Sequence, residues 1–124
     1  MMTDWQEFKG GEHRERYKQM RVTMNIGCEI HLSMRAFAAL ERPKAVKLFF
    51  DVGASRIGVK AVPAGEKTFE VVRRTEGPLG YIRAMSFCRY YGVKPEATIE
   101  FQDVSIDGDG IMVLDLKTAR RLRR

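Results

Sequence analysis

The chain lacks the features that mark membrane and secreted proteins. Among its 124 residues there is no apolar run near the roughly 18 residues that a membrane-spanning helix needs. The segment MMTDWQEFKGGEHRERYKQM at its start lacks the apolar stretch of a secretory signal peptide. Apolar residues nevertheless make up 44% of the chain, which is enough to bury a core. We therefore expect a cytoplasmic protein that has no membrane partner.

Residues that hold metals or perform catalysis are also scarce. The two cysteines, Cys28 and Cys88, are far apart and form no CxxC pair, which favours buried or idle thiols over a disulfide scaffold. The two histidines, His13 and His31, belong to no HExxH motif. His31 and Ser33 would share one face of a strand, but no third group is identifiable that would orient them. We expect no catalytic residue, no metal site and no cofactor, and the sequence does not predict an enzyme.

The excess of positive charge lies in one part of the chain. Lys and Arg number 22 against 16 Asp and Glu, which gives a net charge of +6. Residues 1–116 hold 17 of the basic residues and all 16 acidic ones, so the excess lies in residues 117–124, KTARRLRR. This basic C-terminal tail is interpreted either as a solvated chain end or as an arm that neutralises phosphates.

The first 19 residues have a composition of their own. Acidic and basic residues nearly cancel, apolar residues are few, and Gly10-Gly11 interrupts the segment. We expect a flexible or partly helical extension over residues 1–19. The alternative is a docking arm for a partner that Trp5 and Phe8 would anchor.

From residue 20 onward the sequence predicts two similar halves, each a strand, a short helix and a hairpin. In residues 20–65 we expect a strand over 20–30 that is interrupted at Gly27, a helix over 34–40 with Ser33 as N-cap, and strands over 46–50 and 57–61. In residues 66–116 we expect a strand over 68–73, a turn at 77–78, a helix over about 83–91 that Gly92 ends, and strands over 98–104 and 111–116 around a turn at 107–110.

Neither half has enough residues for a core of its own. A two-stranded hairpin with one short helix is marginal in water, so the halves must pack on each other or on another chain. The expected fold class is α+β, with two interleaved repeats in one small β-barrel-like domain. The interleaving occurs within the monomer or by exchange in a homodimer, and a homo-oligomer is expected.

The repeats resemble the AbrB/MazE/MraZ family of swapped-hairpin, cradle-loop barrels. Residues 91–101, YGVKPEATIEF, are similar to the family's helix-to-strand linker, and Gly27, Ile30, Leu32 and Leu40 occupy matching places in the first half. Ser33 and Arg83 stand where the family has proline, and Phe37 stands where its helix carries arginine. The tail is basic, whereas toxin-neutralising members carry an acidic extension, which makes an antitoxin a weaker interpretation.

The resemblance implies DNA binding, with a role in transcription regulation, through arginines near each strand-to-helix junction. Arginine suits this task because its planar fork binds a phosphate or a guanine edge with two hydrogen bonds. Whether the polyanion is DNA or RNA stays open. The candidate DNA-binding residues are Arg21, Arg35, Arg42, Lys44, Arg73, Arg74, Arg83, Arg89, Lys117, Arg120, Arg121, Arg123 and Arg124.

Two alternatives stand beside this interpretation. Each of these basic side chains could be a solvated charge on a strand edge or helix surface, where it would discourage aggregation. The whole chain could also be a non-enzymatic protein-interaction or oligomerisation module that binds no nucleic acid.

Tyr90 and Tyr91, with Phe87, could form a base-stacking platform. Their helical spacing is more typical of core residues.

Overall fold

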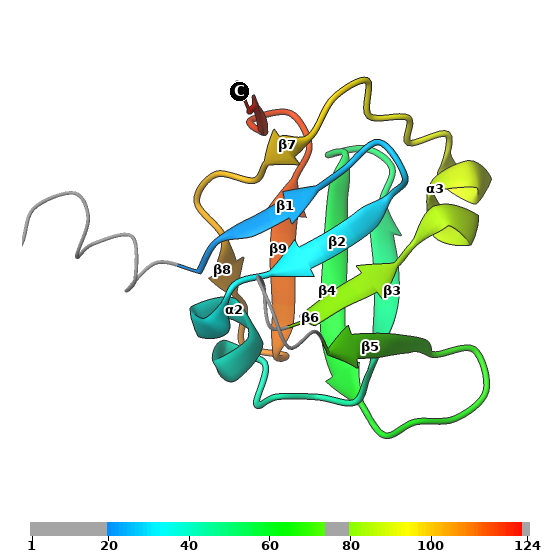
Figure 1. Ribbon diagram of the computed structural model, residues 1–124, viewed down its shortest axis with the longest axis vertical. Coiled ribbons are helices and arrows are strands. Elements are labelled where there is room, and N and C mark those ends of the chain that lie inside the picture. The colour runs from blue at the N-terminus through cyan, green and yellow to red at the C-terminus, as the bar shows by residue number, and fades with distance from the viewer. Residues whose placement is uncertain (1–19, 74–79, 123–124) are drawn as a thin grey trace, which may run out of the picture.

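One antiparallel sheet curls into a half-barrel in the computed structural model, with two short helices beside it in the described residues (Figure 1). The structure describes residues 20–73 and 80–122. In chain order the elements are β1 (Val22–Met24), β2 (Glu29–Leu32), α2 (Met34–Ala39), β3 (Ala45–Asp51), β4 (Arg56–Val62), β5 (Phe69–Arg73), β6 (Gly80–Arg83), α3 (Met85–Tyr91), β7 (Ile99–Glu100), β8 (Ser105–Ile106), β9 (Ile111–Asp115) and β10 (Arg120–Arg121).

The strand order interleaves the two parts of the chain that flank residue 65. It runs β10-β7-β1-β2-β6-β5-β3-β4-β9-β8, and every pairing is antiparallel. The pairs β1–β7, β2–β6, β3–β5 and β4–β9 each join a strand before residue 65 to one after it. Because these pairs join strands of one part to strands of the other, the complete sheet needs both parts of the chain.

The core fills the concave side of the curled sheet. Alternate residues of the strands point inward, and Ile30, Ile57, Ile82, Met112 and Leu114 have no exposed surface. Phe37 of α2 and Phe87 of α3 close the core from the two helices. The buried set contains no charged side chain in the described residues, so these side chains stabilise the fold through hydrophobic burial.

Several expected elements are confirmed with small shifts of their ends. The helix expected over 34–40 is α2, and the Ser33 hydroxyl accepts a hydrogen bond from the Ala36 N–H at 3.2 Å, as an N-cap should. The second helix ends at Gly92, which adopts φ +71°, the left-handed conformation that glycine tolerates. The turn at 107–110 is held by the Asp107 carboxylate, which accepts the N–H groups of Asp109 and Ile111.

The strand expected over residues 20–30 is two strands of a hairpin, and the turn or bulge expected at Gly27 is the turn between them. β1 ends at Met24 and β2 begins at Glu29, and the chain reverses between them. The Asn25 side chain accepts the Glu29 N–H at 3.0 Å, and Cys28 adopts φ +59°. Asparagine and glycine favour such a turn, and the sequence interpretation named the turn or bulge at Gly27 but not the reversal of the chain there.

Two further boundaries differ in the second half. The helix expected from about residue 83 begins at Met85, because Gly80–Arg83 is strand β6, whose central Ile82 is fully buried. Of the strand expected over 98–104 only β7 forms, because the chain bends at Asp103, where φ is +52°, and the next strand, β8, begins beyond the expected range. The bend is required because β7 pairs with β1 whereas β8 pairs with β9.

Two expectations fall outside the described residues, namely the extension over 1–19 and the turn at 77–78. A search of the described part of the chain for a helix long and apolar enough to span a membrane finds none.

Candidate nucleic-acid interface

Most of the basic residues expected to bind DNA lie in the described part of the chain, and all of those are exposed. They are Arg21, Arg35, Arg42, Lys44, Arg73, Arg83, Arg89, Lys117, Arg120 and Arg121. Arg74, Arg123 and Arg124 lie outside the described residues. Exposure satisfies the first requirement for a phosphate contact, because a buried cation could not reach the backbone of a nucleic acid.

These residues do not gather on a single surface. One group surrounds α2, where the Arg73 guanidinium lies 5.5 Å from the centre of the Phe37 ring. Another follows β6 into α3, where Arg83 donates a hydrogen bond to the Tyr81 hydroxyl at 3.2 Å, and this raises the pKa of Arg83. The two helices lie on opposite sides of the curled sheet (Figure 1). The two junctions therefore face different directions.

A third group is assembled around β7 by strand pairing. Arg120 of β10 lies opposite Glu100 of β7, which lies opposite Thr23 of β1. Arg121 lies opposite Ile99, and the Leu122 N–H donates to the Thr98 carbonyl at 2.9 Å. The described end of the basic tail is thus fixed on the sheet edge, although the sequence treats it as a separate arm.

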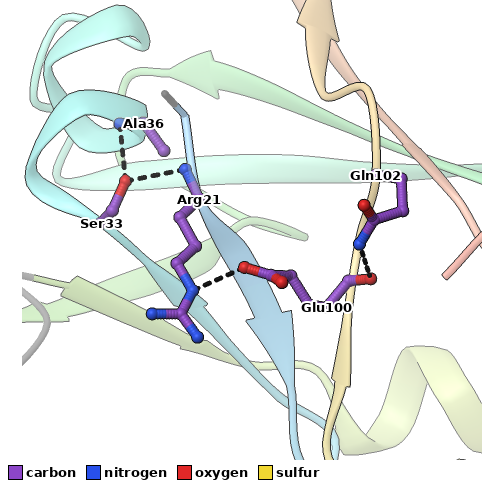
Figure 2. A network of polar contacts seen from close by, with 5 residues as sticks. All are labelled: Arg21, Ser33, Ala36, Glu100 and Gln102. Atoms are coloured by element: carbon purple, nitrogen blue, oxygen red, sulfur yellow. Dashed lines mark hydrogen bonds and ion pairs between the residues drawn. The ribbon is translucent and has the colours of Figure 1, made fainter. Parts of the chain in front are cut away.

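Arg21 joins this group through an ion pair. Its Nε donates to the Glu100 carboxylate at 2.6 Å, and its backbone N–H donates to the Ser33 hydroxyl at 3.0 Å (Figure 2). The Gln102 side-chain amide donates to the Glu100 carbonyl at 3.1 Å. These contacts hold Arg21 and Glu100 beside β10, so cations from the two ends of the described chain meet at β7.

A groove of about 470 Å³ lies next to β7, between the end of α3 and the β3–β4 hairpin. Its apolar lining includes Phe50, Tyr91, Val93, Ile99 and Leu116. Backbone hydrogen bonds fix its walls, since the Val93 N–H donates to the Cys88 carbonyl at 2.8 Å and the Leu116 N–H donates to the Ser55 carbonyl at 3.0 Å. The volume falls in the range of sites that take small ligands. We call this feature the end groove.

Two lysines, Lys94 and Lys117, also line the end groove, and both are exposed. None of the described residues in the lining is acidic. Ile99 connects the groove to β10, because it lines the groove and lies opposite Arg121. Through Ile99, the two lysines of the groove are connected to the cations around β7. We define the β7 cationic surface as Arg21, Lys94, Lys117, Arg120 and Arg121.

Aromatic rings form one wall of the groove. The centres of the Phe50 and Tyr91 rings are 4.8 Å apart, and the Phe87 and Tyr91 rings are 5.0 Å apart. Phe87 is buried as the helical spacing predicts, but Tyr91 is 39% exposed and Tyr90 is 81% exposed. The interpretation of the two tyrosines as core residues is wrong. A seven-residue helix at the end of the sheet buries one face only, and Tyr90 lies on the other.

The side chains considered for catalysis all contact neighbouring groups of the fold. They are Cys28, Cys88, Ser33 and His31. Cys28 and Cys88 are free and buried, and burial together with the hydrogen bond that the Cys88 thiol donates to Cys28 raises the pKa of Cys88 to about 12, so its thiol stays protonated at neutral pH. The Ser33 hydroxyl accepts two backbone hydrogen bonds. His31 stacks on Tyr81 at 5.4 Å. Within residues 20–73 and 80–122 no cluster of three or more potential metal ligands occurs.

Comparisons of the chain with family models, with curated proteins and with solved structures find no match. The candidate interface is therefore argued from geometry and charge alone.

The sequence interpretation missed part of this interface. It named Lys117, Arg120 and Arg121 but left out Lys94, which belongs to the segment 91–101 that carries the family resemblance. It also left out Phe50, whose alternation in a strand predicts an inward-facing residue. Phe50 does face inward, but at the open end of the sheet, where the groove exposes it.

Proposed function

We propose that the chain is a non-enzymatic DNA-binding protein with a role in transcription regulation, and that its β7 cationic surface contacts the phosphates. One observation carries the proposal. Segments that are distant in sequence bring five exposed cations to the two sides of β7, with Arg21 and Arg120 on the side of Glu100 and Arg121, Lys94 and Lys117 on the side of Ile99 and the groove. Neutralising several phosphates at once releases counterions, and this release provides much of the affinity of proteins for DNA.

Two carboxylates near this surface, those of Glu100 and Asp115, are engaged by other groups. Glu100 binds the Arg21 guanidinium. One oxygen of Asp115 accepts the Lys117 N–H at 2.9 Å, and its other oxygen lies 4.0 Å from Arg56 Nε. Lys94, Arg120 and Arg121 form no ion pair among the described residues, and this supports the assignment of phosphate contacts to them.

The interleaved strand order supports the suggested likeness to the swapped-hairpin barrels. Strand–helix–strand order occurs on both sides of residue 65, and the corresponding strands β2 and β6 pair with each other, as do β4 and β9. This is the arrangement that two repeats produce when each contributes strands to a common sheet. We take the two segments 20–65 and 66–116 as these repeats.

The test is the salt dependence of binding to duplex DNA. The double variant R120Q/R121Q should bind more weakly than the wild type. The slope of log affinity against log salt should fall by about 2, because each lost phosphate contact removes about 0.9. Fluorescence anisotropy with a labelled duplex at four or more salt concentrations measures both quantities.

The matched control is R42Q/K44Q, which removes the same charge from the α2 side. This variant should keep the wild-type slope. Wild-type protein that shows no salt-dependent binding would contradict DNA binding altogether. An equal loss of slope in the two variants would show that the contacts are not concentrated at β7.

A second candidate function, self-association without nucleic acid, is favoured by the convex side of the sheet. Phe49 of β3 is 44% exposed there and lies over Gly58, where a Cβ atom would come within 2.8 Å of the Ile111 side chain. Phe49 and Gly58 form a short apolar strip on this side. Lys47 and Lys60 lie opposite each other at one end of the strip, and Asp51 and Arg56 lie opposite each other at the other end. A twofold-related copy would place its lysines against Asp51.

Light scattering on the purified chain tests this candidate. Wild-type protein should form a dimer that Phe49→Ser converts to monomer, because the substitution removes the largest apolar contact of the strip. Met34→Ser, at an exposed position of α2, should leave the dimer intact. A wild type that is monomeric at all concentrations would rule the candidate out.

A further inference from the structure

The end groove exposes aromatic rings that do not fill the core. Phe87 and the inner part of Phe50 contact buried residues, whereas the Tyr91 ring is 39% exposed and is tilted 34° from the Phe50 ring. Tyr90 packs edge-on against Tyr91 at 4.9 Å and is mostly exposed. Exposed rings that are fixed by neighbours form a platform on which a flat ligand can stack without further ordering of side chains.

The charge around this platform selects the kind of flat ligand. Lys94 and Lys117 line the groove, no acidic residue is part of its described lining, and β10 continues the positive charge from Ile99 outward. An aromatic ring that carries a negative group at its side would complement this arrangement. A nucleobase attached to its sugar and phosphate has this chemistry, and sequence-tolerant single-strand sites combine such rings with such cations.

A base that is paired in a duplex cannot reach the platform. Its two faces are covered by the neighbouring base pairs, and the groove is bounded by the β3–β4 hairpin on one side and by residues 92–95 on the other. The ligand must therefore offer an unstacked base. The β7 cationic surface would hold the continuing strand by its phosphates.

We propose that the end groove binds an unpaired base of single-stranded DNA, which stacks on Tyr91 while Lys94 and Lys117 contact its phosphates. The proposal rests on the DNA-binding function and adds to it a preference for unpaired DNA. A DNA strand is the occupant because the groove is continuous with the surface to which we assign DNA binding.

The experiment compares oligothymidylate with an abasic strand of the same length, about twelve nucleotides, within the size of known single-strand sites. Both strands carry the same phosphates, but only the first carries bases. Wild-type protein should bind oligothymidylate about 5- to 150-fold more tightly, which is the gain expected from stacking one base. Anisotropy titrations of labelled strands at a fixed salt concentration give this ratio.

Variants at Tyr91 separate stacking from packing. Tyr91→Phe keeps the ring and should keep the ratio, whereas Tyr91→Leu keeps apolar bulk but removes the ring and should bring the ratio close to one. K94Q/K117Q should weaken the binding of both strands equally and leave the ratio unchanged. Circular dichroism and the thermal midpoint of each variant establish that it is folded, and the lysine variant alters exposed positions only.

The possible failures are distinguishable. If the wild type binds both strands equally well and R120Q/R121Q weakens both, the groove proposal is wrong while DNA binding stands. If neither strand nor a duplex binds, both proposals are wrong. Tighter binding of oligouridylate than of oligothymidylate would overturn DNA as the occupant, and a Tyr91→Leu protein that keeps the wild-type ratio would overturn stacking.

Discussion

The Ser33 hydroxyl joins two elements with one oxygen atom. It accepts the Ala36 N–H in the first turn of α2 and the Arg21 N–H just before β1 (Figure 2). Arg21 in turn binds Glu100 on β7. A capping residue that the sequence identifies as local therefore also helps to position an arginine of the β7 cationic surface.

Ser33→Ala should lower the free energy of unfolding by about 1 to 2 kcal/mol, because one N-cap bond is lost and a second backbone N–H loses its partner. Urea denaturation followed by circular dichroism measures the change. The control is Ser86→Ala at an exposed position of α3, which should change the stability by less than about 0.5 kcal/mol. A Ser33→Ala protein as stable as the control would contradict the capping role.

Individual residues were predictable where their chemistry acts locally. Ser33 as N-cap, Gly92 as helix stop and Asp107 as turn former follow from short-range rules, and the structure confirms each of them. Tyr91 was not predictable in this way. Its helical spacing is the same for a core residue and for a groove residue, and only the position of α3 at the end of the sheet exposes it.

At the scale of elements, length decided what the sequence could predict. The seven-residue strands β3 and β4 alternate clearly and were expected within one residue of their ends. β7, β8 and β10 have two residues each, which is too short for any alternation to appear. They are strands because neighbouring strands present free backbone groups to them.

Strand β10 shows what the pairing of such a short strand means for function. From composition, residues 117–124 are interpreted as a solvated end or a phosphate-binding arm. Pairing with β7 places Arg120 opposite Glu100 and Arg121 opposite Ile99. Pairing fixes Arg120 on the face of Glu100 and Arg121 on the opposite face, and the paired strand loses less conformational entropy on binding than a free arm would.

At the scale of the whole molecule, the two parts of the chain depend on each other for folding. Strand pairs β2–β6 and β4–β9 cross between the parts, and the buried residues Ile30 and Ile82 lie directly opposite each other. Separation of the parts would leave both partners of each pair with free edges and exposed apolar faces.

Fragments 1–65 and 66–124 should therefore be unfolded when each is expressed alone, whereas the intact chain should unfold in one cooperative transition. Circular dichroism and the dispersion of amide signals in NMR spectra measure both. An equimolar mixture should regain the strand signal if the chains find each other. Native-like dispersion in either single fragment would contradict the interdependence.

The sequence by itself determined most of the longer elements, the local caps and turns, and the excess of positive charge at the C-terminal end. These features depend on residues within a few positions of one another. Only the tertiary structure decided which strands are neighbours, that the tail lies on β7, and that Lys94, Lys117 and Tyr91 share a groove. Strand pairing between distant segments depends on how the whole sheet curls, and no local pattern specifies it.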